Sequence, residues 1–133
     1  MGGDLCHHSG EIRPSKYLSI PRDIQPGFAT PILPPCPGDS VFKQLLVRRT
    51  GSENKPFFRP AMGLDIEQAI ETIEKAQVAD ADNNIWFIYA HDRSLLEYVD
   101  LFPLSANAWK EKNWRGKTLW TFLREFETAI KQI

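Results

Sequence analysis

One apolar run, residues 85–90 (Ile-Trp-Phe-Ile-Tyr-Ala), constrains the fold of this chain more than any other feature. It does not alternate with polar residues, so it predicts a strand covered on both faces, as in a layered α/β domain. Such a strand needs neighbours for its backbone groups, and the sequence offers few candidates: the short Phe57-Phe58, the ambiguous stretch 40–49, and Gly2-Gly3-Asp4 as the end of another strand. Part of the sheet is therefore expected to be missing. The free edge of 85–90 predicts marginal stability or aggregation.

Prolines divide the chain near residue 60. Nine of the ten lie between Pro14 and Pro60, including those of the run 31–37. Proline removes a backbone donor and disfavours a helical residue before it, so the segment 14–60 is expected to be a loop region without long helices. Within it, residues 40–49 carry a partial apolar stripe that Asp39 or Ser40 would cap, and both helix and strand remain open there.

The remainder, residues 64–133, predicts the order helix, strand, helix, helix. The first helix has apolar residues at helical spacing and Asp65 as its expected N-cap. The second is short, and the third carries an apolar stripe toward the C-terminus. The three helices are expected at 66–76, between His91 and Pro103, and from about Lys117 to Ile130.

Composition predicts one intracellular domain. A chain of 133 residues suits one domain, and its net charge of -1 gives no electrostatic footprint for nucleic acid or an anionic membrane. No secretory segment follows Met1, and no apolar run is long enough to cross a bilayer. The two cysteines, Cys6 and Cys36, are too few for a disulfide framework and are expected to be reduced thiols. A cytoplasmic location follows as the expectation.

His91 and Asp92 directly follow the predicted strand 85–90. Strand ends are where α/β proteins place reactive side chains. A neutral imidazole there suits metal ligation, and a neighbouring carboxylate can orient ligands from the second shell. Asp92 also stands where a helix N-cap belongs, which is its favoured role. Taken alone, His91 is better explained as a structural histidine with hydrogen-bond partners.

A second group of candidate ligands, Asp4, His7 and His8, lies near the start. On a regular strand the two adjacent histidines would point to opposite faces, so they are not a ready chelating pair. A polar loop pair is the simpler interpretation. The sequence has no GxSxG, no phosphate-binding GxxxxGK[ST], no GxGxxG and no HExxH motif, and no general acid/base pair of carboxylates.

Several blocks resemble the C-terminal region of metallo-β-lactamase-fold hydrolases, particularly fungal members of the lactonase-like branch. At the C-terminal side they are Ile88-Tyr89-Ala90-His91-Asp92, Ser94-Leu95-Leu96, Phe102-Pro103, Asn107-Ala108-Trp109-Lys110, Trp114 and Trp120-Thr121-Phe122-Leu123. Near the start, the segment around the family's metal-bridging aspartate resembles Gly2-Gly3-Asp4, His7-His8, Glu11 and Arg13-Pro14-Ser15.

The resemblance implies an αββα sandwich, of which residues 1–133 would form a single partial domain, the C-terminal half. It implies a two-metal site, usually zinc, in which Asp4 matches the bridging carboxylate and His91 the last histidine ligand. His7 and His8 would border the substrate cleft. Such metals lower the pKa of bound water to about 7 and polarise a carbonyl. The implied reaction is hydrolysis of a small lactone, ester or thioester.

The departure from the family is large, because the HxHxDH motif and the histidine before the aspartate are absent. Asp4 and His91 are two protein ligands where a catalytic zinc has three, so the chain alone is expected to be inactive. The first hypothesis is a C-terminal fragment from a truncated gene or incomplete gene model. The second is a half-domain completed by another chain or by self-association. The third is a non-enzymatic protein that docks through 31–37.

Overall fold

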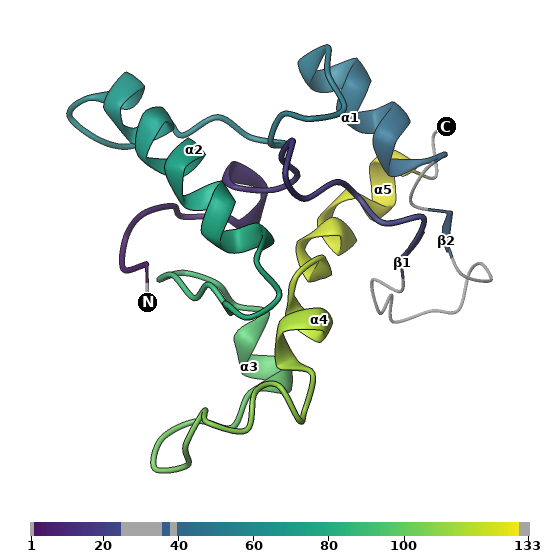
Figure 1. Ribbon diagram of the computed structural model, residues 1–133. Helices are drawn as coiled ribbons and strands as arrows, with labels where there is room; N and C mark the ends of the chain where they lie inside the picture. The colour runs from purple at the N-terminus through teal and green to yellow at the C-terminus, as the bar shows by residue number, and fades with distance from the viewer. Residues whose placement is uncertain (1, 25–35, 38–39, 131–133) are drawn as a thin grey trace.

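The computed structural model describes residues 2–24, 36–37 and 40–130, and every statement below refers to this part of the chain. Helices dominate it, and the two short strands form one antiparallel pair (Figure 1). The elements in chain order are η1 (Ser9–Glu11), β1 (Asp23–Ile24), β2 (Cys36–Pro37), α1 (Phe42–Thr50), α2 (Ile66–Ala81), α3 (Leu95–Tyr98), α4 (Trp114–Thr118), η2 (Thr121–Phe126) and α5 (Glu127–Ile130).

Helix α2 confirms the first predicted helix and extends it to Ala81. The Asp65 side chain accepts a hydrogen bond from the Gln68 backbone N at 2.9 Å, which is the predicted N-cap. Only the C-terminal part of the helix is buried, through Ile73, Gln77 and Asp80. Its N-terminal turns extend beyond the rest of the molecule (Figure 1).

Helix α1 decides the ambiguous stretch 40–49 in favour of helix. Val41 is its N-cap and makes no side-chain cap bond; Ser40 comes before it, and Asp39 lies outside the described residues. Phe42 and Leu46 are fully buried, so packing of one face stabilises the helix without a polar cap. The helix ends at Gly51, whose left-handed φ of 71° would strain any other residue type.

The predicted strand at 85–90 is wrong. The segment has no regular structure and makes two backbone hydrogen bonds with the start of the chain, Gly2 N to Ile88 O at 2.5 Å and Ala90 N to Gly3 O at 2.7 Å. The reason is that the two strands in the described part of the chain are two residues long and pair with each other, so neither provides a ladder for this segment. The αββα sandwich is likewise not seen there and stays an expectation of the resemblance.

The helix predicted after His91 is shorter than expected. Helix α3 ends at Tyr98, and none of its residues is buried, so no packed face favours continuing it toward Pro103. Ser94, not Asp92, is its N-cap residue. The Asp92 carboxylate instead accepts from Ser94 N at 3.1 Å and Ser94 Oγ at 2.5 Å, which closes the turn before the helix.

The predicted C-terminal helix is broken into α4, η2 and α5, and it begins at Trp114 instead of Lys117. The Thr118 hydroxyl donates to the Trp114 carbonyl at 2.9 Å, and the Thr121 hydroxyl donates to the Thr118 carbonyl at 2.8 Å. Such bonds compete with the helical ladder and bend helices. The apolar face was nevertheless predicted correctly, because Leu123 and its apolar neighbours on η2 are buried.

Two apolar clusters form the interior. The main core joins α1, η2 and the loop before α2, while the smaller N-terminal core lies between α2 and the start of the chain. No described helix has the length and apolar content needed to cross a membrane. The main core contains Ile20, Ile24, Phe42, Leu45, Leu46, Phe57, Leu119, Trp120, Phe122, Leu123 and Phe126, and the N-terminal core contains Cys6, Ile12, Ile73 and Tyr89.

Candidate functional site

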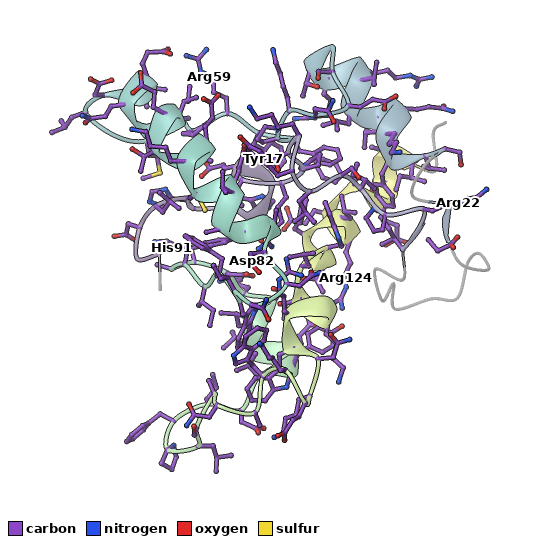
Figure 2. All side chains as sticks on the ribbon, in the orientation of Figure 1. Tyr17, Arg22, Arg59, Asp82, His91 and Arg124 are labelled. Atoms are coloured by element: carbon purple, nitrogen blue, oxygen red, sulfur yellow. The ribbon has the colours of Figure 1, made fainter. Side chains whose placement is uncertain are left out.

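Asp4, His7 and His91 come together at one exposed corner of the molecule. Their ligand atoms all lie within 4.8 Å of one another. His91 Nε2 lies 3.4 Å from Asp4 Oδ1, and the His7 and His91 rings are 5.1 Å apart with a tilt of 31°. His91 projects beside the start of the chain, as Figure 2 shows. This cluster brings together residues separated by most of the sequence.

Glycines position Asp4. A Cβ on Gly2 would lie 2.6 Å from Phe87 Cε1, so only glycine lets the start of the chain lie against the segment 85–90 without a shift. Gly3 has a φ of 51°, and Leu5 N donates to Gly2 O at 3.0 Å, which closes a turn around Asp4. The turn directs the Asp4 side chain toward His91.

His91 is held in an unusual backbone conformation. Its φ is 69°, in the left-handed region that L-residues rarely adopt. Backbone of this kind costs about 1–3 kcal/mol and occurs often at functional sites. The preceding residue, Ala90, is tied to Gly3 by a backbone hydrogen bond of 2.7 Å, which fixes the turn that presents the imidazole.

The neighbouring histidines His7 and His8 lie in a loop, not on a strand, and their side chains have different partners. The His7 backbone N donates to Glu11 Oε2 at 2.8 Å, and its ring faces His91. His8 Nδ1 accepts from Gly10 N at 2.9 Å, and its Nε2 pairs with Glu125 Oε2 at 2.9 Å. His8 therefore connects the N-terminal loop to the C-terminal helices, and only His7 joins the cluster. Their predicted place beside a substrate cleft stays a prediction.

The cluster faces solvent, whereas Cys6 and Tyr89, close to its members in the chain, are buried. The Asp4 and His91 side chains are 74% and 56% exposed. Burial, with the Glu11 carboxylate as the second cause, raises the pKa of the Cys6 thiol to about 12, so Cys6 offers no thiolate ligand at neutral pH. Burial also raises the pKa of Tyr89, whose hydroxyl donates to Ser9 Oγ. The available donors are thus two imidazoles and a carboxylate.

Arg115 holds the segment that carries His91. Its Nε donates to Ile85 O at 3.0 Å, its Nη2 to Asp80 O at 2.7 Å and its Nη1 to Asn83 Oδ1 at 3.2 Å. These bonds fix the turn after α2 and the start of 85–90. Partial burial lowers the pKa of Arg115, but an arginine remains charged at any physiological pH. Sequence reasoning missed this role, which depends on groups at least 30 residues away.

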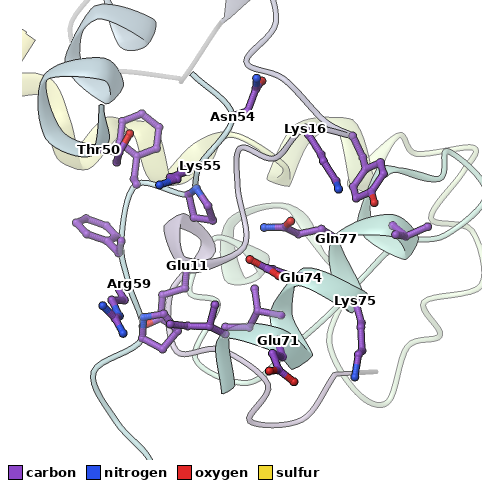
Figure 3. Close-up of a pocket in the computed structure, with 18 of the residues that line it drawn as sticks. Glu11, Lys16, Thr50, Asn54, Lys55, Arg59, Glu71, Glu74, Lys75 and Gln77 are labelled. Atoms are coloured by element: carbon purple, nitrogen blue, oxygen red, sulfur yellow. The ribbon is translucent and has the colours of Figure 1, made fainter. Parts of the chain in front are cut away.

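A hollow with a volume of about 960 Å³ lies between α2 and residues 54–60 (Figure 3). Its rim carries both acidic residues, including Glu71 and Glu74, and basic residues, including Lys55. Glu11 belongs to both places, because it lines this hollow and its carboxylate binds the His7 backbone. The mixture of charges does not select one class of ligand.

The sequence offered His7 and His8 together as candidate ligands and did not show that His7 alone would join the cluster. The spacing Asp-x-x-His across a glycine-containing turn is the signal that could have found it, because such a turn can bring residues three apart to the same side. The donor set of His7, Asp4 and His91 suits zinc, which binds imidazole nitrogen and carboxylate oxygen.

Comparisons with known proteins agree with a metal centre. The chain is 36% identical over 135 residues to the metallo-hydrolase mfmC of Annulohypoxylon moriforme, covering all of this chain and 34% of that protein. It is 38% identical to the gamma-lactamase FDB1 of Fusarium pseudograminearum, covering 95% of this chain and 31% of that protein. A protein of Penicillium brevicompactum named cytochrome P450 monooxygenase mpaDE' is 36% identical over 98% of this chain but only 13% of its own length.

The chain therefore spans about a third or less of the length of these relatives. No protein-family model and no solved structure matches it.

Proposed function

We propose that this chain, which fits a C-terminal portion of a fungal metallo-β-lactamase-fold protein, supplies Asp4 and His91 to the zinc centre of a hydrolase. One observation carries the proposal. Two residues 87 positions apart, which the resemblance matches to metal ligands, lie 3.4 Å from each other at an open corner of the molecule. The names metallo-hydrolase and gamma-lactamase among the relatives support the same chemistry.

The proposed substrates are small molecules with a strained or activated carbonyl: a γ-lactam, suggested by the named relatives, or a lactone, ester or thioester. A bound zinc ion would lower the pKa of a water molecule and polarise the carbonyl. The residues of this chain would orient the ion. Asp4 would do so from the Gly2-Gly3 turn and His91 from its left-handed backbone.

The centre needs residues from outside this chain for full activity. The HxHxDH motif is absent from its sequence, and the chain corresponds to about a third of the named metallo-hydrolase. A two-metal centre requires more ligands than Asp4 and His91 supply. The chain alone is therefore proposed to be inactive and to depend on a partner segment or chain that carries the motif.

The test is a chimera in which this chain replaces the matched 135 residues of the metallo-hydrolase from A. moriforme. We expect zinc-dependent hydrolysis of a γ-lactam or lactone panel, reduced by more than about a hundredfold in the Asp4→Ala and His91→Ala chimeras. The Asp23→Ala chimera, which changes an exposed aspartate outside the cluster, is the matched control and should retain activity. A folded chimera that binds zinc but hydrolyses no member of the panel would contradict the proposal.

A further inference from the structure

We infer that His7 is a third protein ligand, so that Asp4, His7 and His91 hold one zinc ion in this chain alone. This inference rests on the proposed function for the assignment of Asp4 and His91. It gives His7 a metal-ligand role, whereas the resemblance places His7 only beside the substrate cleft. It also changes the expected behaviour of the isolated chain, which would bind a single ion without the HxHxDH residues.

The distances carry the first step. Zinc–nitrogen and zinc–oxygen bonds of about 2.0–2.2 Å place two ligand atoms of a tetrahedral ion about 3.3–3.5 Å apart. Asp4 Oδ1 and His91 Nε2 already lie at 3.4 Å. The remaining separations in the cluster are no larger than 4.8 Å, so His7 reaches ligand distance by a shift of roughly 1.5 Å. Rotation of a half-buried imidazole at a solvent-facing corner provides such a shift.

The donor set carries the second step. Two histidines and one carboxylate are the protein ligands of a well-known class of catalytic zinc sites, in which a water or substrate takes the fourth position. Asp4 and His91 are both mostly exposed, so solvent reaches the centre and can fill that position. A closed structural site would instead need a fourth protein ligand, and the cluster formed by the described residues has three members.

The contacts around the two histidines carry the third step. Glu11 accepts a hydrogen bond from the His7 backbone at 2.8 Å, while Glu125 and Gly10 hold His8 on the other side of the loop. The two histidines thereby have different partners, with the His7 ring beside His91. Glu11 is thus a positioning residue for His7. Partners that bind the ring of a ligating histidine typically change metal affinity by about 10- to 100-fold. Glu11 binds the His7 backbone instead, so its effect is expected at the low end of that range.

The experiment is zinc titration of the isolated chain, by calorimetry and by competition with a chromophoric chelator. We expect one zinc equivalent in the wild-type chain. His7→Ala should weaken binding by more than about a hundredfold, and Glu11→Ala by about tenfold, with partial recovery in Glu11→Gln. His8→Gln, one residue away, is the matched control and should stay within about threefold. Cobalt substitution gives a second readout, because loss of an imidazole changes the visible absorption spectrum of a bound ion.

Three results would overturn the inference: no zinc bound by the folded wild-type chain, equal affinity in wild type and His7→Ala, or equal losses in His7→Ala and His8→Gln. Circular dichroism of each variant establishes that the fold is retained. The proposed function is tested separately. An active chimera whose isolated segment binds zinc independently of His7 would remove His7 as a ligand and leave the hydrolase assignment standing.

Discussion

Arg13 and Asp80 form a buried, two-pronged ion pair between the N-terminal segment and the end of α2. Arg13 Nε donates to Asp80 Oδ2 at 2.8 Å and Nη2 to Oδ1 at 2.6 Å, and both side chains are 3% exposed. Arg13 Nη1 also donates to Leu119 O at 3.0 Å. Burial by itself would lower the pKa of Arg13, but the hydrogen bonds and charge of Asp80 raise it. The pair thus joins three parts of the chain.

The first prediction concerns this ion pair. Asp80→Ala should lower the free energy of unfolding by about 3–5 kcal/mol, because Arg13 would keep a buried charge without its partner. Arg59→Ala is the control, since its ion pair with Glu67 is exposed and should contribute about 0–1 kcal/mol. The measurement is urea unfolding followed by tryptophan fluorescence. Equal losses in both variants would contradict a special role for the buried pair.

The double variant Arg13→Met/Asp80→Leu separates charge from packing. Replacing both charges removes the cost of an unpaired buried ion, so the double variant should be more stable than Asp80→Ala. If it were no better than the single variant, the hydrogen bond from Arg13 to the Leu119 carbonyl would be the more important contact.

The sequence predicted features that depend on neighbouring residues. The spacing of apolar residues and the Asp65 cap are local, and they predicted α2 correctly. The Arg13–Asp80 pair could not be predicted in the same way, because 67 positions separate its members. The failed strand at 85–90 shows the opposite problem: an apolar run suits a strand, but a strand forms only with a neighbour. Asp4 and His91 were matched through resemblance, whereas the contribution of His7 required the turn geometry.

A second prediction concerns the main core. Leu123 of η2 is fully buried in the main core, so Leu123→Ala should destabilise the chain by about 2–5 kcal/mol through lost contacts and a cavity. Leu96→Ala makes the same chemical change on α3, where the side chain is exposed, and should change stability by no more than about 0.5 kcal/mol. Thermal unfolding of the two variants measures the difference. Similar midpoints would mean that η2 is not part of a packed core.

A third prediction uses the buried thiol. In the Cys36→Ser variant, Cys6 should react with a disulfide reagent at pH 8 at least about a hundredfold more slowly than free cysteine, because it is inaccessible and its pKa is about 12. Urea should restore the normal rate. The same pKa shift makes stability depend on pH. The unfolded thiol ionises near 9.0 and the buried thiol near 12, so the free energy of unfolding falls as the pH rises from 9 to about 12. Fast labelling in native buffer would show that the N-terminal core opens readily.

A fourth prediction concerns the approach of the chain start to the segment 85–90. Gly2→Ala places a Cβ against the Phe87 ring, so it should separate Asp4 from His91 and weaken zinc binding by about tenfold, with little effect on global stability. Phe87→Ala in the same chain removes the clash. The double variant should therefore bind zinc more tightly than Gly2→Ala alone. Without that recovery, the effect would have to come from the backbone freedom of glycine.

The last prediction concerns self-association. The chain between α3 and α4 projects from the molecule (Figure 1) and carries exposed Leu101, Phe102 and Leu104, with Phe102 95% exposed. An apolar projection of this kind favours association, and it replaces the free strand edge that the sequence suggested. Phe102→Ser/Leu104→Ser should reduce concentration-dependent light scattering without changing the unfolding midpoint. The control, Met62→Ser/Leu64→Ser, changes exposed apolar residues before α2. If it suppressed scattering equally, general surface hydrophobicity would explain the association and the projection would have no specific part in it.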